Sequence, residues 1–372
     1  MIFVIITHVP HILFQNQYFA YAPYVREMNI WTKGVDKLII VAPKYKIEIT
    51  DIDINYEYEN IEFIALESFD LLSLIGICKA LIVAPNNIWK IYLAMQKANH
   101  IHLRCPGNIG LLGCFVQILF PKKNKTAKYA GNWDLKSPQP LTYRLQKWIL
   151  NNTFLTRKMK VLVYGEWENS TRNIKPFFTA SYFEKDKFEV KPRNLRGTIT
   201  FLFVGALAIG KQPLYAIQLV EQLYKKGNDV QLAIYGEGSE RDKIEKYILE
   251  NNLQDYIFLK GNQNQDTIKK AYIENHFVVL PSLSEGWPKV VAEGMFWGCM
   301  PITTKVSCLS TMLDNGKRGV LLNLNLDKDV EQVETIIKNQ KEYNDKVLHG
   351  INWSRQYTFD AFEYEIKLLL NS

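Results

Sequence analysis

Short β-branched runs alternate with helix-length segments along most of this 372-residue chain. Such runs in the two halves are IFVII (2–6), KLIIVA (37–42), IEFIAL (61–66), KALIVA (79–84), HIHLRC (100–105), TAKYA (126–130) and KVLVY (160–164), then TITFLFV (198–204), DVQLAIY (229–235), YIFLK (256–260) and HFVVL (276–280). This alternation predicts parallel sheets with helices on their faces, because parallel neighbours need a crossover that a helix supplies. We therefore expect an α/β protein with two doubly wound, Rossmann-like sheets.

The polar stretch KPRNLRG (191–197) separates the two series of strands. We expect an N-terminal Rossmann-like domain at residues 1–192 and a C-terminal one at residues 198–350. Residues 351–372 are expected to form a C-terminal helix that returns to the first domain. Ligands of doubly wound sheets bind beyond the carboxyl ends of the strands, so two such sheets predict a binding cleft between the domains.

The cysteine content and the apolar segments favour a cytoplasmic protein. The five cysteines contain no CxxC pair, which is typical of a reducing compartment and not of a disulfide framework or a zinc site. Residues 1–10 have no basic start and no small-residue cleavage site, so they predict a first strand and not a signal peptide. The longest apolar stretches are interrupted or too short to cross a hydrocarbon core of about 30 Å.

Positive charge is concentrated in one part of the chain. Residues 104–175 hold 13 Lys and Arg against 3 Asp and Glu, including the run PKKNKTAK (121–128). This basic region is interpreted as a solvated face or as a surface for anionic partners, either a membrane at which the protein is peripheral or an anionic substrate. No nucleic-acid-binding motif accompanies it, so we expect no nucleic acid partner.

Two glycine-containing turns follow strands of the second series. After TITFLFV come Gly205 and, five residues later, Gly210 with Lys211, and Pro213 opens a helix. Glycines, a helix N-terminus and a lysine together predict a phosphate site, although a plain strand-to-helix turn is the alternative. Gln212 lacks the hydroxyl of a Walker A loop, which excludes that motif. The second turn, Gly236 to Gly238, is a weaker sign of a nucleotide because it lacks a third glycine.

The segment HFVVLPSLSEGWPKVVAEGMFWGCMP (276–301) carries the strongest functional signal. Glu285 lies in the turn after a buried strand, and Glu293 interrupts the apolar stripe of the next helix. A carboxylate among apolar neighbours is costly unless it is paired or hydrogen-bonded. Lys289 near the helix start opposes the helix dipole unless an anion binds there. Local conflicts of this kind tend to mark functional sites, with a stray surface Glu and Lys as the alternative.

These blocks resemble a known family. Glu285 and Glu293 are separated by seven residues, and SEGWPKVVAEGMFWGCMPI (284–302) resembles the E-x7-E signature of the family-four, group 1 retaining glycosyltransferases of the GT-B fold, including those of bacterial surface polysaccharides. FVGALAIGK, LAIYGEGS and DNGKRGVLL fall in the order of that family's other blocks. The resemblance implies two facing Rossmann-like domains and an inter-domain cleft.

The resemblance also implies roles for individual residues. Glu285 is expected to bind hydroxyls of the transferred sugar, Glu293 the ribose, and Lys211 the diphosphate. The expected nucleotide-sugar-binding set is Gly205, Lys211, Gly236, Gly238, Glu285, Gly286, Trp287, Pro288, Lys289 and Glu293. The expected catalytic set is Glu285, Lys211, Arg104 and His102. We expect no metal site and no cofactor, with a UDP- or GDP-sugar as the donor substrate.

The chain departs from the family pattern at two places. Ala206 stands where the family usually has arginine, so Lys289 and Arg104 become candidates for the missing cation. A histidine commonly stands two residues before the proline that corresponds to Pro106, and Arg104 occupies that position here, with His102 two residues earlier. His102 and Arg104 share one face of their strand, and a strand histidine satisfied in the core is the alternative for His102.

The sequence as a whole predicts a retaining, metal-independent glycosyltransferase. It would move a sugar from a nucleoside-diphosphate donor to an acceptor hydroxyl, with a glycan or lipid-linked glycan acceptor at the N-terminal domain. Two alternatives stay open: a nucleotide-sugar 2-epimerase on the same scaffold, and a noncatalytic subunit that binds a nucleotide-sugar or a glycan.

Overall fold

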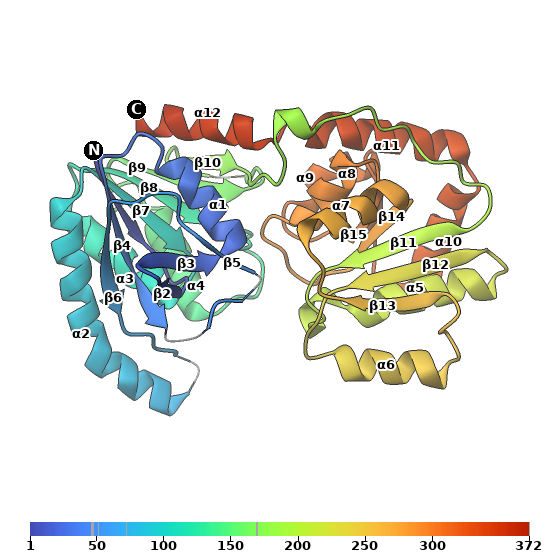
Figure 1. Ribbon diagram of the computed structural model, residues 1–372, viewed down its shortest axis with the longest axis horizontal. Coiled ribbons are helices and arrows are strands. Elements are labelled where there is room, and N and C mark those ends of the chain that lie inside the picture. Colours follow the sequence, from blue (N-terminus) through green and yellow to red (C-terminus); the bar gives the residue numbers. More distant parts are fainter. Residues whose placement is uncertain (46–47, 51, 72, 169, 372) are drawn as a thin grey trace. The chain divides into compact units, whose positions relative to one another are not determined.

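The computed structural model describes residues 1–45, 48–50, 52–71, 73–168 and 170–371 (Figure 1). The chain divides into two compact units, one formed by residues 1–178 and 362–372 and the other by residues 179–361. Each unit contains its own β-sheet with helices packed on it. The prediction of an α/β protein with two largely parallel sheets is confirmed.

The sheet of the N-terminal unit has a parallel part in the order β10-β9-β8-β7-β1-β4, with β6 also on β4. These strands are β1 (Ile2–Ile6), β4 (Lys37–Tyr45), β6 (Ile61–Leu66), β7 (His100–Cys105), β8 (Asn124–Tyr129), β9 (Met159–Tyr164) and β10 (Ile174–Phe177). Strand β1 lies between β4 and β7, and its residues 3–6 are fully buried. An apolar run without alternation is expected for a parallel strand that is covered on both faces.

An antiparallel extension, which the sequence analysis did not predict, continues this sheet. It consists of β2 (His11–Phe14), β3 (Gln17–Tyr21) and β5 (Asp53–Asn55). Gln15 and Asn16 form the β2–β3 turn with φ values of 45° and 62°, the left-handed backbone that a two-residue hairpin turn needs. Tyr18 and Tyr21 therefore lie on a strand.

Helices of the N-terminal unit are α1 (Ala22–Trp31), α2 (Leu74–Lys97), α3 (Asn108–Val116), which continues into the short η1 (Gln117–Leu119), α4 (Leu141–Leu150) and most of α12 (Phe359–Leu370). The run KALIVA (79–84) lies inside α2 and not in a strand, which corrects the prediction. Ala80, Val83 and Asn87 are buried at helical spacing. Packing therefore makes this run helical, although its β-branched residues favour a strand. Among the described residues, no helix is long and apolar enough to span a bilayer.

The sheet of the C-terminal unit is parallel throughout, in the order β13-β12-β11-β14-β15-β16. Its strands are β11 (Ile199–Val204), β12 (Val230–Tyr235), β13 (Ile257–Gly261), β14 (Phe277–Leu280), β15 (Met300–Thr304) and β16 (Val320–Leu322). The four strands named in the sequence analysis are present, and β15 and β16 are additional. The order reverses between β11 and β14, which is the topological switch point of a Rossmann-like sheet.

Helices cover both faces of this sheet. They are α5 (Pro213–Lys225), α6 (Arg241–Glu250), α7 (Gln265–Glu274), α8 (Lys289–Phe296), the short α9 (Leu309–Met312), α10 (Leu326–Ile337) and α11 (Gln340–Ser354), with 3-10 turns η2 (Glu184–Asp186), η3 (Ile209–Lys211) and η4 (Asp314–Gly316). Phe201 and Phe203 of β11 join the core formed with α5, α6 and α10, while Leu202 joins the core with α7 and α8. Alternate side chains of the strand thus face opposite layers.

The unit boundaries differ from the predicted domains 1–192, 198–350 and 351–372. Residues 179–192 belong to the C-terminal unit, because Tyr182 and Phe188 pack on Trp297 with ring centroids 5.0 Å away. Arg193, inside the predicted linker, donates hydrogen bonds to the carbonyls of Tyr272 and Gly298 at 2.8 and 2.6 Å. The C-terminal residues that group with the N-terminal unit begin at Phe362.

Candidate functional site

The candidate site lies at the switch point of the C-terminal sheet. Two loops leave the carboxyl ends of the neighbouring strands β11 and β14, one through residues 205–212 and the other through residues 281–288. The backbone N–H of Leu283 donates to the Gly210 carbonyl at 2.9 Å, and the Gln212 side-chain amide donates to the Pro281 carbonyl at 2.7 Å. These bonds hold the two loops together.

Lys211 and Glu285 connect the two loops by an ion pair. The Lys211 Nζ lies 2.5 Å from the Glu285 Oε1. The Glu285 side chain is 7% exposed and that of Lys211 is 32% exposed, so the carboxylate is buried while the ammonium group still reaches solvent. A buried carboxylate requires a partner, and Lys211 is that partner. The structure thus brings together two residues that are 74 positions apart in the chain.

Space is left open over the first loop. A methyl group built on Gly205 or on Gly210 would meet no atom within 4 Å. Gln212, with φ of 49°, turns the chain into α5, whose first residue is Pro213. The first turn of a helix presents backbone N–H groups without intrahelical partners, and these favour an anion. Open backbone, a helix start and the Lys211 ammonium group together suit a phosphate.

Gly236 and Gly238 serve this site indirectly. A Cβ on Gly236 would lie 1.9 Å from the Gly205 carbonyl oxygen, and one on Gly238 would lie 2.5 Å from the Leu207 carbonyl oxygen. Their φ values of 147° and 156° are also ones that side chains rarely adopt. The two glycines allow the loop after β12 to pack directly on the loop after β11. Their expected contact with a nucleotide stays a prediction, whereas their packing role is visible.

Residues at the end of β15 and just after it support the second loop. The Cys308 thiol donates to the Gly286 carbonyl at 3.1 Å, and the Thr304 hydroxyl donates to the Ser282 carbonyl at 2.5 Å. Burial raises the pKa of Cys308 to about 12, so the thiol keeps the proton that it donates. Nothing in the sequence singles out Cys308, because a lone cysteine without a motif gives no signal of a supporting role.

The side chain of Trp287 turns toward α11. Its ring stacks on Trp353, with centroids 6.1 Å apart, and contacts Tyr357 edge-on at 5.4 Å. Helix α8 begins at Lys289, with Pro288 as the residue before its first turn. The aromatic contacts therefore fix the course of the chain at Gly286, Trp287 and Pro288, where the backbone was expected to meet the donor.

Glu293 has partners of its own. Its carboxylate accepts hydrogen bonds from the Ser181 hydroxyl at 2.5 Å and from the Tyr272 hydroxyl at 3.3 Å. The same carboxylate and Lys289 line a small cavity with Ser181 and Trp287. Among the described hydrogen bonds, none joins Glu293 to Lys211 or Glu285. Its expected role at the ribose stays a prediction, and no local pattern indicates Ser181 as its partner.

Arg104 belongs to a buried charge cluster of the N-terminal unit. Its guanidinium group lies 3.1 Å from the Glu27 carboxylate, and the Lys128 Nζ lies 2.6 Å from the same oxygen. The side chains of Glu27 and Lys128 are 4% and 1% exposed. Arg104 is therefore already paired within its own unit, and this does not support it as the cation that replaces an arginine at Ala206.

His102 is a core residue of the N-terminal unit, and its burial does not support its assignment to the catalytic set. It is fully buried, its ring lies 4.5 Å from that of Trp31, and its Nδ1 is 2.8 Å from the Thr126 hydroxyl. His100 shares that hydroxyl at 2.9 Å. Burial holds the pKa of His102 well below its usual value, so the imidazole stays neutral. A fully buried ring cannot contact a substrate.

His8 is the histidine at the carboxyl end of the parallel strands of this unit. It follows β1, and a Cβ on Gly107, just after β7, would lie 2.7 Å from the His8 Nδ1. Desolvation and the positive charge of Arg104 lower the pKa of His8. The local sequence THVPH (7–11) does not single out His8, because strand order is needed to bring residue 8 beside residue 107.

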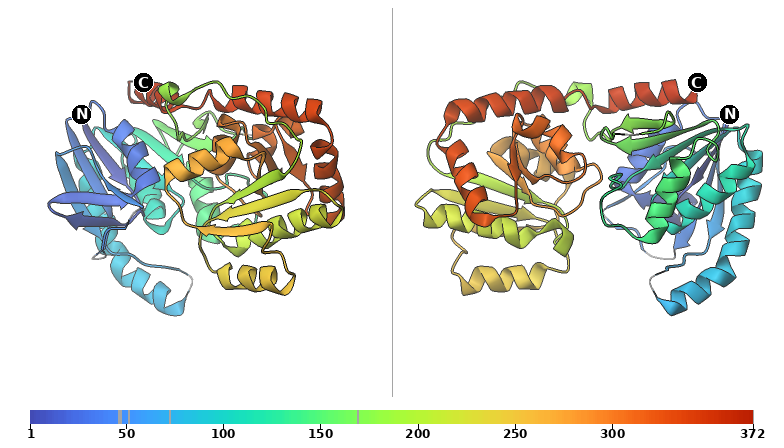
Figure 2. Two further views of the ribbon diagram at one scale, coloured as in Figure 1. Left: turned by 45° about the vertical axis from the view of Figure 1, so that its right-hand side comes forward. Right: turned by 180° about the vertical axis from the view of Figure 1, so that it is seen from behind.

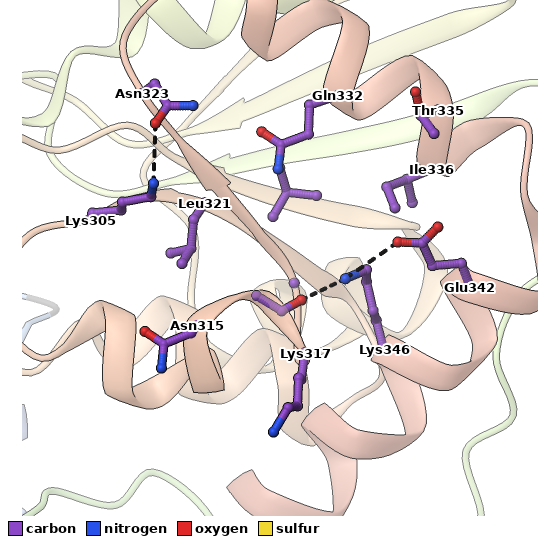
Figure 3. A pocket seen from close by; sticks show the side chains of 13 residues that line it. Lys305, Asn315, Lys317, Leu321, Asn323, Gln332, Thr335, Ile336, Glu342 and Lys346 are labelled. Atoms are coloured by element: carbon purple, nitrogen blue, oxygen red, sulfur yellow. Dashed lines mark hydrogen bonds and ion pairs between the residues drawn. The ribbon is translucent and has the colours of Figure 1, made fainter.

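A hollow of about 540 Å³ lies against β16, the edge strand of the C-terminal sheet (Figure 3). Lys305, Lys317 and Lys346 line it, but Lys346 donates to the Gly316 carbonyl at 2.6 Å and Lys305 to the Asn323 amide oxygen at 3.2 Å. It lies two strands away from β14 and thus away from the switch point. Among the described residues, no cluster of three or more His, Cys, Asp or Glu could hold a metal ion.

Comparison with known proteins finds a family match within the C-terminal unit. Residues 184–349 match the model of the family "Glycosyl transferases group 1". The chain is 28% identical over 160 residues to an uncharacterized glycosyltransferase of Methanocaldococcus jannaschii, covering 43% of this chain and 44% of that protein. It is 27% identical over 169 residues to a poly(ribitol-phosphate) alpha-N-acetylglucosaminyltransferase of Staphylococcus aureus, covering 45% and 34% of the two chains. The chain thus spans less than half the length of these curated relatives.

The fold is also similar over the whole chain to a solved structure. The match is Anabaena HepE, crystallised in complex with UDP-glucose, with a TM-score of 0.70, 11% sequence identity and coverage of 100% of this chain and 99% of that one. At this identity the likeness shows the fold alone, which is the GT-B fold that the sequence predicted. The matched residues 184–349 lie in the C-terminal unit and contain Lys211, Glu285 and Glu293 in the expected blocks, so the C-terminal unit is similar to the group 1 glycosyltransferases.

Proposed function

We propose that the protein is a retaining glycosyltransferase that moves a sugar from a UDP- or GDP-sugar to an acceptor hydroxyl. The observation that carries the proposal is the Lys211–Glu285 ion pair at the switch point of a group 1 domain, beside open backbone at Gly205 and Gly210. A cation and a carboxylate held side by side match the two halves of a nucleotide-sugar, namely its diphosphate and the hydroxyl groups of its sugar.

In this reaction the bond between the anomeric carbon and the β-phosphate oxygen breaks, and a bond from that carbon to the acceptor oxygen forms on the same face. Negative charge builds up on the departing diphosphate, and Lys211 together with the start of α5 stabilises it. The proton of the acceptor hydroxyl passes to the departing phosphate. Glu285 accepts hydrogen bonds from hydroxyls of the sugar and keeps Lys211 in position before the donor binds. The charge of Lys211 supports a metal-independent reaction.

Ala206 leaves one cation of the family pattern without a counterpart. Lys289 is our candidate to replace it, because it begins α8 close to the second loop, whereas Arg104 is paired with Glu27. Losing one preorganised donor typically slows a reaction roughly 100- to 1,000-fold. A variant with arginine at position 206 should therefore react faster than the natural chain if Lys289 does not compensate, and at the same rate if it does.

The relatives support a glycan acceptor and a uridine nucleotide. The S. aureus relative acts on poly(ribitol-phosphate), and HepE was crystallised with UDP-glucose. We infer an acceptor that is a glycan or a lipid-linked glycan, in cell-surface glycan assembly on the cytoplasmic side of a membrane. The basic region 104–175 supports a peripheral contact with that membrane.

The test is to incubate the full chain with a panel of UDP- and GDP-sugars and to follow the nucleotide and the sugar separately. We expect slow release of UDP or GDP without an acceptor, faster release with one, and retention of the anomeric configuration in the product. An epimerised donor would support the 2-epimerase alternative. Saturable binding of a sugar nucleotide with no turnover under any condition would support the noncatalytic alternative.

A further inference from the structure

Helix α2 of the N-terminal unit exposes apolar side chains on the face that points away from the core. Its inner face contains the buried residues Gly76, Ala80, Val83, Asn87, Ile91 and Ala94. The opposite face carries Ile75, Cys78, Ile82, Pro85, Trp89 and Leu93, spaced three or four residues apart. This spacing aligns them in one stripe along the helix. We call these six residues the outer stripe of α2.

The outer stripe is strongly exposed. The side chains of Ile75, Ile82 and Trp89 are 83%, 79% and 60% accessible, and Leu81 beside them is 74% accessible. Figures 1 and 2 show α2 along one side of the N-terminal unit, with no described element of that unit outside it. Single exposed apolar residues are normal on a protein surface. A contiguous exposed apolar surface, by contrast, marks an interaction site.

Aromatic contacts connect the outer stripe to a basic segment. The Trp89 ring stacks on Tyr92 at 5.8 Å, Tyr92 packs on Phe120 at 5.3 Å, and the Lys123 ammonium group lies 5.4 Å from the Phe120 ring. Lys123 also donates to the carbonyls of Met95 and Ala98 at the end of α2. Helix α2 itself contains three lysines and no acidic residue. The apolar stripe is thus flanked by positive charge.

A basic hollow of about 850 Å³ lies close to Lys123. It opens at the amino ends of β8 and β9 and starts at Asn124, directly after Lys123. Its ten lining residues include Arg157, Lys158, Lys160 and Arg172 and no acidic side chain. Phe154 at its rim is 70% exposed. Four of the 13 basic residues of region 104–175 therefore line a hollow at the strand ends opposite to those where ligands of parallel sheets bind.

We propose that the outer stripe of α2 and the basic hollow dock the N-terminal unit on an anionic lipid bilayer, with α2 lying in the plane of the headgroups. The proposal rests on the proposed function in one respect, namely that the protein acts at a membrane. Aromatic and aliphatic side chains enter the boundary between headgroups and acyl chains, while Lys and Arg bind the lipid phosphates. No covalent step is involved.

The chemistry of the surface favours lipid over a second copy of the chain. Two copies that met through this face would bring the lysines and arginines around the stripe close to those of the other copy, and like charges in contact repel. A bilayer that contains anionic lipid satisfies both the apolar and the basic side chains. Burial of the apolar side chains and attraction of the Lys and Arg side chains to anionic lipid both favour this binding.

The test measures binding of the full chain to vesicles by sedimentation. One set contains phosphatidylcholine alone, and the other contains phosphatidylcholine mixed with phosphatidylglycerol. The test variant combines Ile82→Ser with Trp89→Ser, and a charge variant combines Arg157→Glu with Lys160→Glu. The control is Leu249→Ser, because Leu249 is 61% exposed on α6 of the other unit. Unfolding temperature, sedimentation without vesicles, and donor hydrolysis in solution are measured for every variant.

We expect the natural chain to bind the anionic vesicles and to bind them less tightly as salt rises. Ile82→Ser with Trp89→Ser should weaken binding by at least about tenfold, with Leu249→Ser unchanged and hydrolysis in solution unchanged. No vesicle binding by the natural chain, equal binding by the test variant, or a dimer that the test variant dissociates would each overturn the proposal. Vesicle binding without any sugar transfer would contradict the proposed function and leave the docking surface intact.

Discussion

The ammonium group of Lys211 lies 2.5 Å from the buried carboxylate of Glu285, and this pair joins the loops after β11 and β14. The two strands are neighbours at the point where the strand order reverses. The pair therefore places one cation and one anion beyond the carboxyl ends of the parallel strands, where this fold binds ligands. Each residue has a separate part in the proposed reaction, and substitutions can tell these parts apart.

Replacing Lys211 by alanine should lower kcat/KM for sugar transfer roughly 100- to 1,000-fold, because it removes a preorganised charge from the departing diphosphate. Steady-state kinetics with the preferred donor measure the change. Lys243→Ala is the matched control, since Lys243 is paired with Glu240 on the exposed surface of α6, where a pair contributes little. A Lys211→Ala enzyme that works as well as Lys243→Ala would contradict the role of Lys211.

Glu285→Gln should abolish transfer while the chain still binds the nucleotide. The amide keeps the size of the side chain but removes the negative charge. That charge pairs with Lys211, and the carboxylate that carries it accepts hydrogen bonds from hydroxyls of the sugar. Titration calorimetry with UDP or GDP and a transfer assay on the same sample separate the two effects. Full transfer activity in Glu285→Gln would show that this carboxylate takes no part in the reaction.

The ion pair should also contribute to stability. A double-mutant cycle with Lys211→Ala, Glu285→Gln and the double variant should give a coupling free energy of about 0.5–3 kcal/mol in denaturant unfolding. Lys211→Ala alone leaves the buried Glu285 carboxylate without its ammonium partner and should be the most destabilised of the three. Additive effects of the two substitutions would mean that the pair is not formed in solution.

Gly236→Ala and Gly210→Ala should differ sharply. A Cβ at Gly236 would lie 1.9 Å from the Gly205 carbonyl oxygen, so Gly236→Ala should lower the unfolding temperature. A Cβ at Gly210 meets no atom, so Gly210→Ala should fold normally and raise KM for the donor by occupying the space over the loop. Thermal unfolding and donor kinetics measure both. Equal unfolding temperatures would argue against the close packing of the two loops.

The N-terminal unit should lose stability between pH 7.5 and 5. Burial lowers the pKa of His11 and of His100 to about 4, from 6.5 in an unfolded chain, and burial also holds the pKa of His102 well below 6.5. Below pH 6.5 the unfolded state therefore binds protons that the folded state does not, and each of these residues lowers the free energy of unfolding by up to about 1.4 kcal/mol per pH unit. Urea unfolding across this range, above the titration of the carboxylates, measures the slope. A flat profile would contradict neutral, buried histidines.

Periodicity and motif spacing predicted much of the C-terminal unit. Strands such as HFVVL are short, apolar and followed by turn residues, and the E-x7-E spacing marks the loop and helix that follow β14. The contact of Lys211 with Glu285 depends on β11 and β14 being neighbours, which local sequence does not encode. The family resemblance, and not the spacing of these two residues, placed them in one site.

The N-terminal unit was harder to predict for identifiable reasons. KALIVA has the composition of a strand, yet it lies in α2 because burial of Ala80, Val83 and Asn87 requires a helix. Alternation along HIHLRC predicted that His102 and Arg104 share one face of the strand. It could not predict which layer of the unit would cover that face. Trp31 and Thr126 enclose His102 from distant parts of the chain. Tertiary packing decided these cases.

The most direct test of the central claim is a crystal structure of the full chain with UDP or GDP bound. The account predicts that the diphosphate lies within hydrogen-bond distance of the Lys211 Nζ, beside Gly205 and the turn at Gly286, with Glu285 facing the position of the sugar. A nucleotide bound in the hollow against β16, in the basic hollow of the N-terminal unit, or anywhere else away from Lys211 would contradict it.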